Sequence, residues 1–103
     1  IRGGENIGCG EVEAALLEHP LVQEASVYAV PDQRLGEEVG TTLYVSSSVT
    51  ESELSGFLQE RLAKFKIPRY VHQQQTPLPR TASGKILKRD LREEACQRLG
   101  LTQ

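Results

Sequence analysis

The chain has 103 residues, a formal net charge of −2 at pH 7 and no methionine. This length suits one small domain with a single core, and no apolar run reaches the roughly 20 residues of a membrane-spanning helix. Cys9 and Cys96 lie far apart, with no His or Cys nearby at metal-ligand spacing. We therefore expect no membrane span, no metal site in this chain and two reduced thiols in a cytoplasmic protein, of which this chain is a fragment or a processed piece.

The charge is divided unequally along the chain. Residues 1–60 contain 2 Arg against 11 Asp or Glu, a balance of −9, and residues 61–103 contain 10 Lys or Arg against 3 Asp or Glu, a balance of +7. A basic block of this kind indicates an anionic partner. The alternative is internal neutralisation, in which the two halves pack against each other.

The first half of the chain predicts one helix and two strands. Apolar residues recur at helical spacing in residues 11–18, and Pro20 follows them. Residues 22–30 alternate as a strand does, with Val27 and Tyr28 on opposite faces. A turn from Pro31 to Gly36 and a second strand over 38–46 predict an antiparallel pair.

The second half predicts two longer helices and a third strand. Residues 50–63 form the first helix, with a capping box from Thr50 and Glu53 and four residues facing the core, namely Leu54, Phe57, Leu58 and Leu62. Residues 70–75 predict a strand, and residues 88–99 predict a helix that Gly100 closes. The fold class is α+β, a small mixed or antiparallel sheet of about three strands packed by helices, with a glycine-rich entry and a mobile lysine loop.

The segment PRTASGK at residues 79–85 carries the most chemistry. A proline and a small, flexible run present one lysine just before the last helix, and lysine is a compact positive charge on a long stem. The segment is no phosphate-binding P-loop, because that motif needs glycine where Pro79 stands and Ser or Thr where Ile86 stands. Lys85 can deliver a charge to the active site of another domain, or the segment can be a solvated basic turn that caps a helix.

Three stretches together resemble a known family: GGENI at 3–7 with EVE at 11–13, VPDQRLGE at 30–37, and PRTASGK at 79–85. In this order they are similar to the C-terminal domain of adenylate-forming enzymes, which include acyl-CoA synthetases, firefly luciferase and the adenylation domains of peptide synthetases. The resemblance covers essentially all 103 residues. It implies that residues 1–103 are a single mobile C-terminal domain whose large N-terminal ATP- and acyl-binding domain is absent. One departure is Gly8-Cys9-Gly10, where many relatives have an aromatic residue and a proline, so we expect a looser segment there.

The resemblance also implies a reaction and its residues. A carboxylic acid reacts with ATP to give an acyl-adenylate, and a thiol then displaces AMP. The cofactors are ATP, bound with Mg²⁺ mainly by the absent domain, and coenzyme A (CoA). Lys85 is the implied catalytic residue, and the implied cofactor-binding residues are Gly3, Gly4, Asn6, Phe65, Lys66 and Arg69.

We expect the full-length protein to be an AMP-forming acid–thiol ligase for a fatty or aromatic acid, and the isolated chain to be inactive. Its partners are then its own N-terminal domain, the acid, ATP and CoA. One alternative acceptor is the phosphopantetheine arm of a carrier protein. Another alternative is a stand-alone anion- or RNA-binding module, but only Phe65 and Tyr70 supply aromatic rings in the basic half, so we expect no nucleic acid.

Overall fold

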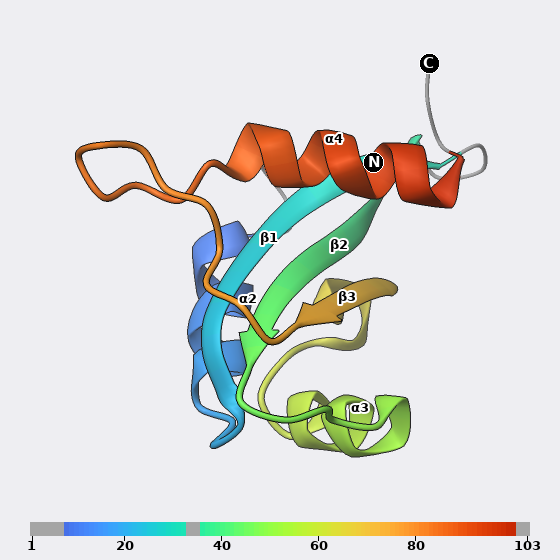
Figure 1. Ribbon diagram of the computed structural model, residues 1–103. Coiled ribbons are helices and arrows are strands. Elements are labelled where there is room, and N and C mark those ends of the chain that lie inside the picture. The colour runs from blue at the N-terminus through green and yellow to red at the C-terminus, as the bar shows by residue number, and fades with distance from the viewer. Residues whose placement is uncertain (1–7, 33–35, 101–103) are drawn as a thin grey trace.

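The computed structural model describes residues 8–32 and 36–100. These residues form three α-helices, a short 3₁₀ helix and three strands (Figure 1). In chain order they are α2 (Cys9–Leu17), β1 (Val22–Asp32), β2 (Gly36–Val45), α3 (Glu51–Gln59), η1 (Lys64–Lys66), β3 (Tyr70–Gln74) and α4 (Lys88–Leu99). The predicted α+β class is confirmed.

The three strands form one mixed sheet in the order β1-β2-β3. β1 and β2 are antiparallel, as predicted, while β3 runs parallel to β2. The prediction that a turn begins at Pro31 is wrong, because Pro31 and Asp32 continue the ladder opposite Glu37 and Gly36. A proline is tolerated there since β1 lies at the edge of the sheet, where a missing N–H need not cost a ladder bond.

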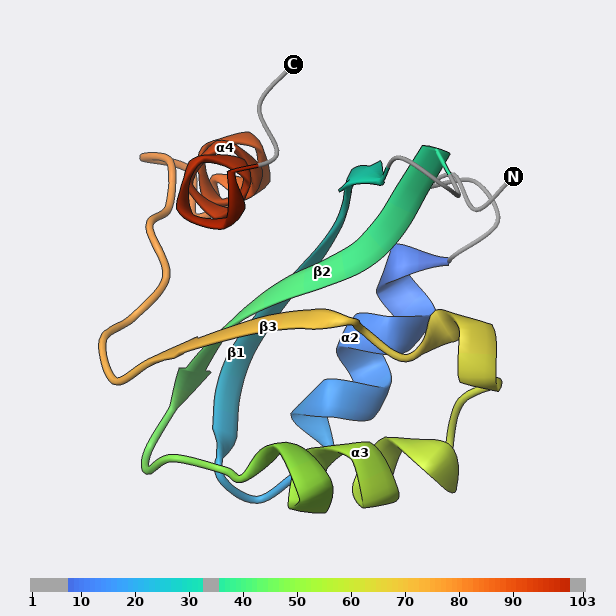
Figure 2. The ribbon, with the colours of Figure 1, turned by 90° about the vertical axis from the view of Figure 1, so that its right-hand side faces the viewer.

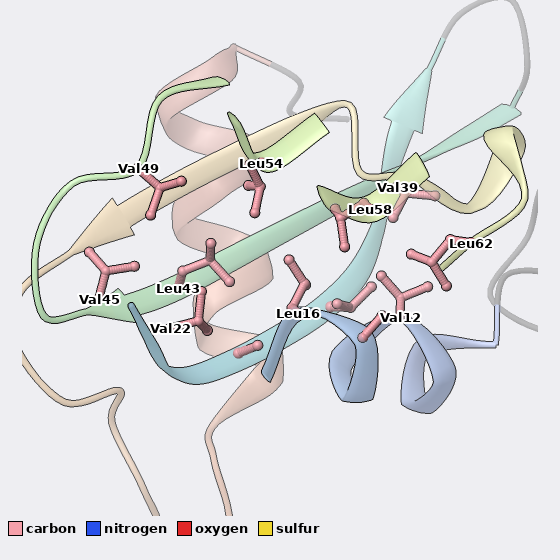
Figure 3. Packing of buried hydrophobic residues seen from close by; sticks show 13 residues of the cluster. Val12, Leu16, Val22, Val39, Leu43, Val45, Val49, Leu54, Leu58 and Leu62 are labelled. Atoms are coloured by element: carbon pink, nitrogen blue, oxygen red, sulfur yellow. The ribbon is translucent and has the colours of Figure 1, made fainter. Parts of the chain in front are cut away.

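Helices cover both faces of the sheet. α2 and α3 lie on one face and α4 lies on the other, as Figure 2 shows. The larger core fills the first face and contains Val27 and Leu43 of the sheet together with Leu16 and Leu58 of the helices (Figure 3). A second cluster lies beneath α4 and includes Tyr28 and Val30 of β1 with Leu78, Leu91 and Ala95. The predicted alternation of β1 is thus confirmed, and both of its faces are buried.

Local signals explain the start of α3 and the end of α4. The predicted cap of α3 is confirmed, since the Thr50 hydroxyl accepts from the Glu53 N–H at 3.1 Å, but the Glu53 carboxylate bonds the His19 Nε2 at 3.0 Å instead of completing a capping box. Gly100 has a φ of 70° and ends α4 as predicted. In the segment expected to be loose, Gly8 is the N-cap of α2 with a φ of 67°, and Cys9 and Gly10 already belong to the helix.

Two smaller expectations can be compared with the structure. Leu54, Leu58 and Leu62 are buried as predicted, whereas Phe57 is only partly buried and packs against the core from its rim. Cys9 and Cys96 are both free. Among the described helices, none is both long and apolar enough to cross a membrane.

Candidate functional site

Lys85 lies in a tight, hydrogen-bonded turn. The turn is closed by an antiparallel bridge between Arg80 and Ile86. Within it the Thr81 N–H donates to the Lys85 carbonyl at 2.7 Å, and the Gly84 N–H donates to the Thr81 carbonyl at 2.9 Å. Gly84 has a φ of 94°, a left-handed conformation that favours glycine. The backbone conformation of the turn therefore favours glycine at the position before Lys85.

The side chain of Lys85 points to solvent. The residue is exposed, and its ammonium group has no hydrogen bond or ion pair with any residue in the ranges 8–32 and 36–100. Figure 1 shows the segment between β3 and α4 projecting away from the sheet. This arrangement leaves a full positive charge available to a group that this domain does not itself supply.

The turn is anchored to the sheet by Glu24 of β1. One Glu24 oxygen accepts from the Leu78 N–H at 2.8 Å, and the other bonds the Arg80 guanidinium. Arg80 also donates to the Gly84 carbonyl at 2.6 Å. The sequence predicted a small, flexible run here, whereas the structure shows a turn that is tied internally and to β1, because a charge far away in the sequence packs beside it.

The Glu24 carboxyl is held in its charged form. Burial alone would raise its pKa, but the hydrogen bonds from Arg80 and the Leu78 N–H, with the charge of Arg80, outweigh burial and lower the pKa below its ordinary value. Glu24 is therefore an ionised partner for Arg80 at neutral pH. Sequence reasoning missed this residue, although a charge next to the apolar stretch of a predicted strand was a usable signal.

The start of α4, three residues after Lys85, has a second anchor. Glu13 of α2 pairs with the Lys88 ammonium at 2.8 Å and accepts from the Val27 N–H at 2.8 Å. Cys9 lies close to this pair, and its pKa is raised, mainly because burial disfavours the thiolate while the Lys88 charge offsets part of the effect. The Cys9 thiol is thus protonated at neutral pH.

Four of the ten basic residues in the second half of the chain are neutralised internally. Four basic residues of the second half pair with carboxylates of the first half: Arg61 with Glu18, Lys66 with Glu11, Arg80 with Glu24 and Lys88 with Glu13. The prediction of internal neutralisation is correct for these residues. Lys85, Arg89 and Arg98 have no ion pair within the part of the chain that the structure describes. The charge available to an outside anion is therefore smaller than the composition indicated.

Phe65 and Arg69 line an open groove of about 510 Å³, together with Glu38, Lys64 and Ile67. The Phe65 side chain is 47% exposed, and the Arg69 guanidinium lies over the Tyr70 ring at 5.5 Å. An exposed aromatic face beside a guanidinium suits a ligand with a planar ring and an anionic group. Glu38 was not predicted as part of this groove.

Lys66 occupies a different position from Phe65 and Arg69. Its ammonium pairs with Glu11 of α2 at 2.5 Å and lies 5.7 Å from the centre of the Phe65 ring. The sequence grouped these three residues, and the structure places Phe65 and Arg69 on the groove while Lys66 faces α2. To reach a ligand in the groove, Lys66 would have to leave Glu11.

The Lys85 turn and the groove are not brought together. The lining of the groove includes no residue of the turn, and η1, which carries Phe65, lies apart from the segment between β3 and α4 in both Figures 1 and 2. Gly3, Gly4 and Asn6 lie outside the described residues. Within residues 8–32 and 36–100, no group of three or more His, Cys, Asp or Glu side chains is placed to hold a metal ion.

Comparisons with known proteins agree with this geometry. Residues 11–85 match the family described as AMP-binding enzyme C-terminal domain. The chain is 45% identical over 103 residues to the mitochondrial medium-chain acyl-CoA ligase ACSF2 of Mus musculus, covering 98% of this chain and 17% of that protein. It is 47% identical over 93 residues to the 2-succinylbenzoate–CoA ligase of Bacillus velezensis, covering 90% of this chain and 19% of that protein.

Solved structures show the same fold. The o-succinylbenzoate CoA synthetase of Bacillus subtilis, in complex with the acyl-adenylate intermediate OSB-AMP, has a TM-score of 0.79 and 43% identity over 86% of this chain and 18% of that chain. The same enzyme in complex with ATP and magnesium ion has a TM-score of 0.77 and 43% identity over 88% of this chain and 18% of that chain. This chain thus spans less than a fifth of the length of the relatives that it matches.

Proposed function

Since this chain belongs to the AMP-binding enzyme C-terminal domain family, we propose that residues 1–103 are the mobile C-terminal domain of an ATP-dependent, AMP-forming carboxylic acid–CoA ligase. The large domain that binds ATP, Mg²⁺ and the acid would lie elsewhere in the same protein. The observation that carries this proposal is the exposed Lys85 ammonium, which has no partner within the described residues and stands on a fixed turn. The isolated domain would be inactive, because the acid and nucleotide pockets belong to the larger domain.

In the first half-reaction Lys85 would act by its charge. A carboxylate oxygen attacks the α-phosphorus of ATP, the bond to the pyrophosphate oxygen breaks, and pyrophosphate leaves. Negative charge shifts between oxygens of the two reactants during this step. An ammonium held close to those oxygens stabilises the transition state more than the ground state and transfers no proton. The fixed Arg80–Ile86 turn supports this role, since orientation is set before the reactants meet.

In the second half-reaction the domain would present its other side. The CoA thiol loses its proton to solvent, its sulfur attacks the acyl carbonyl carbon, the bond from that carbon to the phosphate oxygen breaks, and AMP leaves. The groove would take the nucleotide of CoA, with the Phe65 ring against the adenine and the Arg69 guanidinium beside a phosphate. We propose further that Lys66 assists there after leaving Glu11, that Gly3 and Gly4 line the pantetheine channel, and that Asn6 lies near the nucleotide during the first half-reaction.

The separation of the two regions supports a rotation between the steps. The segment that carries Lys85, between β3 and α4, lies apart from η1, which carries Phe65, in both views (Figures 1 and 2). One orientation cannot direct both regions at the same reaction centre. A rotation of the domain would withdraw Lys85 and bring the groove to the active site while the sheet and helices keep their arrangement, and only the Lys66 side chain would leave its partner Glu11.

The substrate classes follow the names of the relatives. A medium-chain acyl-CoA ligase and a 2-succinylbenzoate–CoA ligase support a fatty or aromatic acid and favour free CoA as the acceptor over a carrier protein. The internal ion pairs weaken the alternative of a stand-alone RNA-binding module, because they occupy four of the basic residues. Two free cysteines suit a reducing compartment, and we propose the cytoplasm.

The full-length protein provides the direct test. It is incubated with ATP, Mg²⁺ and a panel of fatty and aromatic acids, and acid-dependent exchange of labelled pyrophosphate into ATP is measured. With one or more acids we expect exchange, and after addition of CoA we expect AMP and an acyl-CoA thioester in equal amounts. An absence of exchange with every acid, or transfer only to a carrier protein, would overturn the proposal.

Replacing Arg69 with alanine is expected to raise the KM for CoA about tenfold, which corresponds to one lost charge-assisted contact of about 1.4 kcal/mol. Pyrophosphate exchange should not change, because the groove faces away from the first half-reaction. Initial rates at varied CoA concentration measure the effect. Arg89→Ala is the matched control, since Arg89 is exposed on α4 and lies outside the groove. An equal rise in KM for both variants would contradict the role of Arg69.

A further inference from the structure

A chain of polar contacts leads from the sheet to the residue beside Lys85. It begins at Glu24 of β1, whose side chain is only 18% exposed. Glu24 bonds Arg80, and Arg80 donates to the carbonyl of Gly84, which directly precedes Lys85. Glu24 also accepts from the Leu78 N–H at 2.8 Å, ahead of the turn. We call this set the Glu24 clamp.

The clamp depends on the shape of the arginine side chain. A guanidinium presents several donors in one rigid plane, so it can bond two acceptors at once in a fixed relation. Arg80 uses one nitrogen for Glu24 and another for the Gly84 carbonyl. The orientation of the turn relative to β1 is thereby coupled to a single carboxylate.

Without the charge of Glu24, the turn would keep its internal conformation, but its orientation relative to β1 would no longer be fixed by Arg80. Its internal bonds, between Thr81 and Lys85 and between Thr81 and Gly84, do not involve Glu24. The Glu13–Lys88 pair would still hold the start of α4. The bond between Arg80 and Glu24 would be released while Leu78 and Ile86 stay packed against the second cluster, so the turn could pivot about these contacts and the position of the ammonium would spread over a wider range.

From this geometry we propose that Glu24 is a positioning residue for adenylate formation, which acts through Arg80 to set the direction in which the turn presents Lys85. The proposal rests on the proposed function of Lys85. A misplacement of about 1 Å in a reacting group can cost on the order of a hundredfold in rate. Glu24 thus contributes to the rate of the first half-reaction without contacting either reactant.

The test is Glu24→Gln in the full-length enzyme. Glutamine keeps the size of the side chain and an oxygen for the Leu78 N–H, but it removes the charge that holds Arg80. We expect kcat for pyrophosphate exchange to fall about 10-fold to 100-fold, with the KM values for ATP and the acid within about twofold. Thioester formation from supplied acyl-adenylate should stay within about twofold, because Lys85 is withdrawn in that step.

Glu18→Gln is the matched control. It breaks another Glu–Arg pair, Glu18 with Arg61 at 2.9 Å, which joins the end of α2 to α3. We expect this variant to retain the rates of both half-reactions. A loss of exchange equal to that of Glu24→Gln would overturn the proposal, since any lost ion pair would then have the same effect.

A second comparison separates positioning from general damage. In a Lys85→Ala background, Glu24→Gln should cause no further loss of exchange, because there is no ammonium left to position. A further loss of the same factor, equal losses in both half-reactions, or an unchanged rate in the single variant would each overturn the proposal.

If Glu24→Gln fails to fold, Arg80→Lys serves in its place, because lysine keeps the charge but lacks the planar fork. That variant should lose about tenfold in exchange, and an unchanged rate would overturn the proposal.

The outcome can be distinguished from failure of the proposed function. If Lys85→Ala retains normal exchange, the function assigned to Lys85 is wrong and the positioning proposal is wrong with it. If Lys85→Ala loses exchange while Glu24→Gln does not, only the positioning proposal is wrong.

Discussion

Lys85→Ala in the full-length protein is expected to lower the rate of adenylate formation by about 10²-fold to 10³-fold, the range seen when one preorganised electrostatic contact to a transition state is removed. The Lys85 ammonium has no partner within the described residues, so its removal breaks no contact that stabilises them. The loss should therefore be catalytic, with the melting temperature unchanged. Acid-dependent pyrophosphate exchange, together with thermal unfolding, measures both quantities.

The second half-reaction provides an internal control for this variant. Thioester formation from supplied acyl-adenylate and CoA should change far less, since the proposed rotation would direct Lys85 away from the active site in that step. Arg98→Ala removes another exposed charge without an ion pair in the described residues, at the far end of α4, and should leave exchange unchanged. Equal losses in the two half-reactions would contradict the role given to Lys85, as would normal exchange.

Gly40→Ala is expected to lower the free energy of unfolding by about 1–3 kcal/mol through overpacking. A Cβ atom at Gly40 would lie 2.9 Å from Cε1 of Tyr28 and 3.3 Å from Cγ1 of Val30. The ring of Tyr28 is buried, and its hydroxyl is hydrogen-bonded to Thr42 at 2.7 Å, so it cannot move aside without losing that bond. Urea unfolding of the 103-residue chain measures the change.

Gly56→Ala is the matched control for this substitution. Gly56 lies on α3, and a Cβ atom there would have no neighbour within 4 Å. Alanine is favoured over glycine in a helix by about 0.8–1.0 kcal/mol, so this variant should be more stable than the parent chain. The two alanine substitutions should thus have opposite signs. A stability loss at Gly56, or none at Gly40, would contradict the packing argument.

Most of the secondary structure could be predicted from local patterns. The periodicity of residues 88–99 and the glycine after it predicted α4 with the bounds that the structure has. The cap of α3 was also predicted from Thr50. The extension of β1 through Pro31 could not be predicted in the same way, because a proline favours a turn unless the strand lies at the edge of a sheet, and strand order is not a local property.

In the candidate site, too, local features could be predicted from the sequence and long-range contacts could not. The motif at residues 79–85 predicted Lys85 as the candidate catalytic residue, which stays a prediction, and the charge balance of the two halves raised internal neutralisation as an alternative. The partners of each charge were not predictable. Glu24 and Arg80 are 56 positions apart, and nothing in the sequence around either one indicates the other.

By itself, then, the sequence determined the α+β class, the sites of most helices and strands, and the lysine available for chemistry, because periodicity, capping and motif spacing are properties of neighbouring residues. Only the tertiary structure decided that Glu24 anchors the lysine turn, that Gly40 is needed beneath the Tyr28 ring, and that the segment carrying Lys85 lies apart from η1, which carries Phe65. These three features depend on which surfaces pack together. Burial of the whole core and long-range strand pairing determine which surfaces pack together. A short stretch of the sequence does not specify its packing partners.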